Sequence, residues 1–172
     1  MNASTLRDAA RVYMTSLALI ALAAVAMLML SRARARELMP LAFGHVHRSA
    51  GTALSIALDN ARVALVPLSL SLVAHQGRAI RALGDSLAGA MLLFNAAELG
   101  SAVAGYGART LVALAPHAPL ELAAYSAAGA AYLAGRHQPL EPARLAALAA
   151  ACAVLLLVAA VLETYVQLRA PA

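Results

Sequence analysis

The stretch LAPHAPLELAAY, residues 114–125, places an ionisable pair in the middle of a long apolar run. Pro116 disfavours helical backbone in the residue before it, and Pro119 lacks the N–H that a helix interior requires. A broken helix is therefore predicted, with a second half that starts near His117. In that half His117 and Glu121 are four residues apart and share one face. A charged group at the centre of a membrane helix costs about 2.5 to 3.5 kcal/mol, so the pair is expected to face the interior of a helical bundle.

The composition of the whole chain agrees with a membrane setting. Of its 172 residues 63% are hydrophobic and 12% are charged, and the mean hydropathy is +0.77. Soluble domains contain about twice that share of charged residues. At roughly 20 residues per crossing, four or five spans with short loops use the whole length. A single integral-membrane domain over residues 1–172 is therefore predicted.

The predicted fold class is an all-α, polytopic transmembrane bundle of about five helices, with the fourth span broken at Pro116 and Pro119. The expected spans are residues 12–30, 53–74, 87–105, 110–135 and 145–168. A signal peptide competes for the first run, because AVA at residues 24–26 resembles a cleavage site. The run is longer than a usual signal core and continues past AVA, which favours an uncleaved first helix.

Arginine supplies all thirteen basic side chains, and the net charge is +5. In a soluble protein this balance suggests nucleic acid. Here several arginines lie at the ends of the predicted spans, where lipid head groups and topology explain them, so membrane lipid and no nucleic acid is expected as partner. The arginine count does not decide the orientation, because each side of the membrane receives six. Cys152 is the only cysteine, which excludes a disulfide framework and a CxxC site.

Polar residues interrupt the second predicted span. Asp59 and Arg62 are three residues apart and can neutralise each other across one turn. In the alternative interpretation Asp59 or Asn60 caps a helix that begins there, but the remaining dozen residues are too few to cross a membrane. Pro67 is expected to kink the helix.

The third and last predicted spans also carry polar groups. Asn95 and Glu98 lie three residues apart, and a stripe of small residues at spacing four accompanies them, formed by Ala97, Ser101 and Gly105. Such a stripe lets another helix approach closely. Glu163 lies near the end of the last span, where it can reach the interface. His45 and His47, at spacing two, have no third ligand nearby and are interpreted as exposed loop residues.

Four segments together resemble the stage II sporulation protein M family of bacterial integral-membrane proteins. They are LDNARVALVPL (residues 58–68), LLFNAAELG (92–100), LAPHAPLELAAYSAAGAAYLAG (114–135) and VLETYVQL (161–168). The resemblance covers roughly residue 54 to the C terminus, and the arrangement of Pro116, His117 and Glu121 is its most specific part. Ala96 and Ala118 stand where the family usually has glycine.

The resemblance implies a membrane scaffold. The named family member holds cell-wall hydrolases at the membrane during engulfment of the forespore. Other members resemble membrane subunits encoded beside an ATPase in clusters for making, exporting or resisting circular bacteriocins. The family offers no catalytic residue to transfer, so Asn60, Asn95, His117, Glu121 and Glu163 carry over as matching polar positions.

The expected function is that of a non-enzymatic, multi-pass scaffold or complex subunit in the cell membrane, without cofactor, metal or catalytic residues. Its expected partners are lipid and other membrane or membrane-associated proteins, such as a cell-wall hydrolase or an ATPase subunit, and homo-oligomerisation is left open. One alternative is an exporter subunit. Another is an intramembrane hydrolase with Glu98, His117, Glu121 and Glu163 around a metal or water, although HExxH is absent. The candidate intramembrane binding residues are Asn60, Asn95, Glu98, His117, Glu121 and Glu163.

Overall fold

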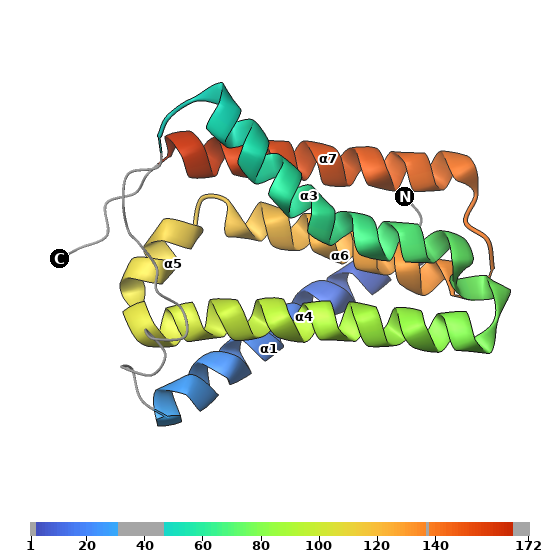
Figure 1. Ribbon diagram of the computed structural model, residues 1–172, viewed down its shortest axis with the longest axis horizontal. Helices are drawn as coiled ribbons and strands as arrows, with labels where there is room; N and C mark the ends of the chain where they lie inside the picture. Colours follow the sequence, from blue (N-terminus) through green and yellow to red (C-terminus); the bar gives the residue numbers. More distant parts are fainter. Residues whose placement is uncertain (1–2, 31–46, 137, 167–172) are drawn as a thin grey trace.

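A computed structural model describes residues 3–30, 47–136 and 138–166 (Figure 1). Every regular element in these ranges is helical, which confirms the predicted all-α bundle. The elements are α1 (Ala3–Leu30), α3 (Ala50–Val73), the short 3₁₀ helix η1 (Ala74–Gln76), α4 (Arg78–Tyr106), α5 (Ala108–Leu114), α6 (Ala118–Gly135) and α7 (Pro142–Tyr165).

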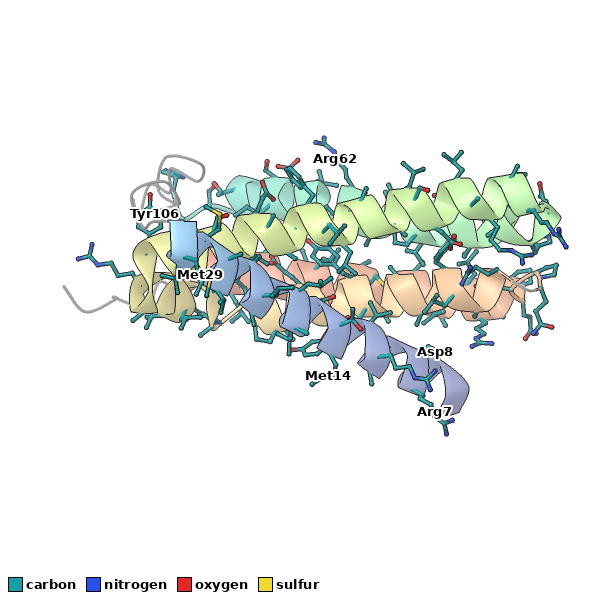
Figure 2. The ribbon with its side chains drawn as sticks, turned by 90° about the horizontal axis from the view of Figure 1, so that it is seen from below. Arg7, Asp8, Met14, Met29, Arg62 and Tyr106 are labelled. Carbon is teal, nitrogen blue, oxygen red and sulfur yellow. The ribbon has the colours of Figure 1, made fainter. Side chains whose placement is uncertain are left out.

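Helix α6 is the central element of the bundle. It contacts α1, α3 and α7, while α1 crosses the bundle obliquely and packs along α4 (Figures 1 and 2). The buried side of α6 consists mainly of small residues, among them Ala124, Ala128 and Ala131. Small side chains let helix backbones approach closely, which is how membrane helices commonly pack.

Large apolar side chains cover the outside of the bundle. Leu22, Met29, Leu65, Phe94 and Val154 are all more than half exposed, whereas most of the buried hydrophobic residues are alanine. Four described stretches are long and apolar enough to cross a membrane, namely Arg7–Met29, Ala50–Gln76, Arg78–Tyr106 and Pro142–Tyr165. A surface of this kind has lipid as its natural solvent, which indicates a membrane protein.

The predicted break in the fourth span is confirmed. Helix α5 ends at Leu114, and α6 begins at Ala118 with His117 as its N-cap residue. Pro119 lies in the first turn of α6, where the missing N–H costs nothing. The carbonyl oxygen of His117 accepts from the backbone N–H groups of Leu120 and Glu121 at 2.9 and 3.2 Å.

Two helices begin nine residues before the apolar runs that predicted them. Helix α1 starts at Ala3 rather than near residue 12, and α4 starts at Arg78 rather than near residue 87. The hydropathy pattern marks the part of a helix that suits lipid, whereas the backbone hydrogen bonding continues through the polar residues at the ends. The last residues of the fifth predicted span, 167 and 168, lie outside the described residues.

Helices α1 and α4 approach each other closely at Gly100. A Cβ atom on Gly100 would lie 2.5 Å from Ala23 Cβ and 2.7 Å from Ala24 N. The predicted small-residue stripe is therefore only partly right. Ser101 and Gly105 are buried as expected, but Ala97 is exposed, and Ala96 and Gly100, each one position earlier than a predicted stripe residue, are buried.

Candidate functional site

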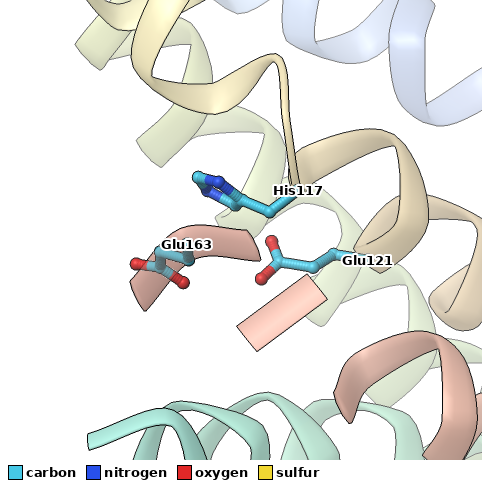
Figure 3. Close-up of side chains that lie close together, drawn as sticks. All are labelled: His117, Glu121 and Glu163. Atoms are coloured by element: carbon cyan, nitrogen blue, oxygen red, sulfur yellow. The ribbon is translucent and has the colours of Figure 1, made fainter. Parts of the chain in front are cut away.

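Three ionisable side chains from two helices converge near one end of the bundle. His117 occupies the N-cap position of α6, Glu121 belongs to the first turn of that helix, and Glu163 lies in the last turn of α7. One possible ligand atom from each residue lies within 4.8 Å of the other two. Figure 3 shows the imidazole and both carboxylates gathered beside the break that precedes α6. The break thus brings the predicted pair close to Glu163, whose chain position alone suggested only an interfacial residue.

Asn60 extends this group to a third helix. Its Nδ2 group donates a hydrogen bond of 2.5 Å to Glu121 Oε1. Asn60, His117, Glu121 and Glu163 are hereafter called the polar cluster. The cluster connects α3, α6 and α7, which are also the helices that form most of the buried apolar core.

The polar cluster is incompletely paired within the described part of the chain. His117 is only 7% exposed, and its buried Nδ1 atom has no hydrogen-bond partner there. The three ion pairs found between described residues join Arg11 to Asp8, Arg62 to Asp59 and Arg136 to Asp85. None of them reaches Glu121 or Glu163. Partly buried carboxylates without a cation nearby are unfavourable as anions, which favours a proton or a bound cation at this place.

A cavity of about 510 Å³ adjoins the polar cluster. Its walls come from α1, α3, α4, α5 and α6 and are mostly apolar, with Pro67, Leu92, Leu114 and Leu122 among the lining residues. Glu121 belongs both to the polar cluster and to this wall. The volume lies within the range of small-molecule pockets, and the lining suits an apolar group with one polar end.

The two candidates on α4 do not join the polar cluster. The Asn95 side chain donates to Met91 O of its own helix at 2.8 Å while also lining the cavity. Glu98 lies with Val63, Phe94 and Asn95 along a second, more open pocket of about 410 Å³ between α3 and α4. The expectation that Glu98 shares a metal or a water with His117 is therefore corrected. The position of Glu98 on α4 directs it to this second pocket.

A second group of polar residues was missed by the sequence analysis. Arg136 Nη2 donates to Asp85 Oδ2 at 2.7 Å, and the Tyr132 hydroxyl donates to Asp85 Oδ1, also at 2.7 Å. Gly84 makes room for this hydroxyl, since a Cβ there would lie 2.7 Å from it. Asp85 and Tyr132 also line the cavity. The sequence feature that could have indicated this group is the spacing of Tyr132 and Arg136, which are four residues apart and therefore lie on the same side of the helix.

Three smaller predictions concern isolated positions. Arg62 Nη1 pairs with Asp59 Oδ1 at 2.9 Å, as predicted, and both side chains are exposed. His47 is exposed, in agreement with the loop interpretation, while His45 lies outside the described residues. The buried thiol of Cys152 donates to Ala124 O at 3.3 Å, which fits a packing role.

Comparison with known proteins adds no relative to this description. No protein-family model, curated protein or solved structure matches the chain, so its membership of the stage II sporulation protein M family stays a prediction.

Proposed function

We propose that this chain is a non-enzymatic scaffold or subunit of a complex in the bacterial cell membrane, with a role similar to that of stage II sporulation protein M. The observation that supports this proposal is the position of the Asp59–Arg62 ion pair. The two side chains are 62% and 79% exposed, and Arg62 projects away from the bundle (Figure 2).

The ion pair lies near the middle of α3. At the helical rise of 1.5 Å per residue, Asp59 is about 14 Å from the start of the helix at Ala50, and Arg62 is about 17 Å from its end at Val73. Both positions fall within the hydrocarbon layer, about 30 Å thick, that such a helix would cross. A lipid-facing arginine there is unfavourable by about 2.5 to 3.5 kcal/mol. Polar groups of another molecule are therefore needed to shield this side chain from lipid.

We propose that a transmembrane helix of another protein packs over the ion pair. Leu54, Leu58 and Leu65 are each more than half exposed and share the outer face of α3 with Arg62, at spacings of three and four residues. This stripe can pack against an apolar helix. At its centre the Asp59–Arg62 pair requires polar or charged groups on the partner, which would give the contact its register and specificity.

Purification from native membranes in mild detergent, followed by mass spectrometry, tests the proposal. The variant Asp59→Asn/Arg62→Gln removes both charges and should make α3 easier to accommodate in lipid, so its loss of a partner would not reflect poor insertion. The wild type is expected to recover a membrane partner, and the variant to recover at least about tenfold less.

The chain supplies a matched control in Asp8 and Arg11. These residues have the same types and spacing but lie in the first turns of α1, which begins at Ala3, where head groups can solvate them. Asp8→Asn/Arg11→Gln should recover the partner normally. Equal recovery by all three proteins, or no partner with the wild type, would contradict the proposal. An ATPase, a wall hydrolase or a second copy of this chain would each define the complex further.

The exporter subunit is the second candidate function, and the break between α5 and α6 favours it. Interrupted helices beside a midplane site are a feature of many transporters, and here Leu114, Ala118 and Glu121 line the cavity next to the break. The chain has no Walker motif, so ATP coupling would need a separate protein. Absence of pH-driven or ATPase-coupled flux in reconstituted vesicles would eliminate this candidate.

A further inference from the structure

We propose that His117, Glu121 and Glu163 bind one divalent transition-metal ion of the Zn²⁺ class. The set contains one imidazole and two carboxylates, and both groups are standard ligands of such ions. This inference goes beyond the proposed scaffold function and does not depend on the presence of a partner.

The geometry of the three side chains suits a single ion. Their possible ligand atoms already lie within 4.8 Å of one another. Around a tetrahedral ion with bonds of about 2.0 to 2.2 Å, ligand atoms are separated by roughly 3.3 Å. Small side-chain rotations therefore complete the site without a movement of the helices. His117 and Glu121 share a face of α6, and Glu163 reaches the same place from α7 (Figure 3).

The electrostatics of the site provide an independent argument for a cation. Glu121 and Glu163 are partly buried, and neither has an ion-pair partner among residues 3–30, 47–136 and 138–166. A divalent ion would neutralise both carboxylates at once. The nearly buried imidazole of His117 points to the same ligand, because its Nδ1 atom has no hydrogen-bond partner in those ranges. A metal bond to Nδ1 would satisfy this atom.

Asn60 supplies the supporting contact that metal sites usually contain. Its amide donates to Glu121 Oε1, which orients the carboxylate and leaves Oε2 available for the ion. Three protein ligands leave a fourth coordination position for water or another small ligand. The oxygen-rich cages preferred by Ca²⁺ and Mg²⁺ lack an imidazole, and Cu⁺ prefers sulfur ligands, so the donor set favours ions such as Zn²⁺.

Metal analysis of the full chain, purified in detergent without an affinity tag, is the first test. The wild type is expected to carry about one ion per chain, and His117→Ala, Glu121→Gln and Glu163→Gln less than about a tenth of that. Glu98→Gln removes a carboxylate from α4 that lies outside the polar cluster, and His47→Ala removes an exposed imidazole. Both control variants should keep the full metal content.

A second test avoids variants that lose metal only because they misfold. Wild-type protein is stripped with a chelator, and Zn²⁺ is then added while Tm and bound metal are followed. The Tm is expected to rise saturably with one equivalent of Zn²⁺, since an ion that binds only the folded state stabilises it. Asn60→Ala keeps all three ligands and is expected to bind Zn²⁺ about 10- to 100-fold more weakly.

Two results would overturn the proposal. One is stripped wild-type protein that takes up neither Zn²⁺, Mn²⁺ nor Fe²⁺ and shows no rise in Tm. The other is full metal content in the His117→Ala, Glu121→Gln and Glu163→Gln variants, which would assign the metal to other residues. Metal that is lost in these variants, kept in Glu98→Gln and restored to stripped wild type would establish the site.

Discussion

At the scale of single residues, Gly100 places a strong steric constraint on α4. A Cβ on this residue would meet the Cβ of Ala23 and the backbone nitrogen of Ala24 on α1, so Gly100→Ala must push the two helices apart. We expect a loss of about 1 to 3 kcal/mol in the free energy of unfolding, measured in mixed detergent micelles. Gly89→Ala is the matched control on the same helix, because a Cβ there has no neighbour within 4 Å. It should be neutral or stabilising by up to about 1 kcal/mol.

A comparison of two asparagines separates a contact between helices from a contact within one helix. Asn60 donates to Glu121 on α6, whereas Asn95 donates to Met91 O of its own helix. Asn60→Ala is expected to lower the free energy of unfolding by about 0.6 kcal/mol and by no more than about 1.7 kcal/mol, the average and the maximum for hydrogen bonds between membrane helices. Asn95→Ala should change it less. Equal effects of the two variants would show that the Asn60–Glu121 contact contributes nothing particular to stability.

At the scale of helices, the local chemistry of the sequence predicted the break but not the neighbours. Pro116 and Pro119 act on their own backbone, so the end of α5 and the start of α6 could be derived without a structure. The hydrogen bond between Asn60 and Glu121 joins residues 61 positions apart, and its existence depends on how α3 rotates against α6.

The membership of the polar cluster illustrates the same limit. Periodicity fixes which residues share a face of one helix, and it placed His117 beside Glu121 correctly. It does not fix which face of another helix turns toward them. From the sequence alone, either Glu98 or Glu163 could therefore have joined His117 and Glu121 in the polar cluster. The packing of α7 against α6 is what places Glu163 there.

The contact between the start of α4 and the end of α6 is a second prediction at this scale. The Tyr132 hydroxyl donates to Asp85 and also approaches Arg81 O at 3.2 Å. Tyr132→Phe should cost about 0.5 to 1.5 kcal/mol of unfolding free energy, because one intramolecular hydrogen bond is lost while the ring stays in place. Tyr125→Phe, on the same helix and the same cavity wall, is the control. Similar losses in both variants would argue against the contact with Asp85.

At the scale of the whole molecule, the helix order assigns the connections to two opposite ends of the bundle (Figure 1). Residues 76 and 138 lie at one end, and residues 48 and 108 lie at the other. All four residues are exposed. Single cysteines at Gln76 and Gln138 should react with a membrane-impermeant maleimide from one side, and those at Arg48 and Ala108 from the other. Native Cys152 is buried and should not react with the maleimide. Labelling of all four positions from one side would contradict a membrane-spanning bundle and would also leave the orientation undecided.

The alanine- and glycine-lined interior around α6 has a consequence for how this sequence can change over time. Ala124, Ala128 and Ala131 have no exposed surface, and a Cβ on Gly135 would collide with the Ser71 carbonyl oxygen. At such positions side-chain volume limits substitution. On the outer surface a larger side chain can be accommodated, and the polarity of the side chain limits substitution instead. A saturation library should therefore tolerate Leu→Phe outside and Ala→Ser inside, while rejecting Ala→Leu inside and Leu→Ser across the lipid-facing stripes.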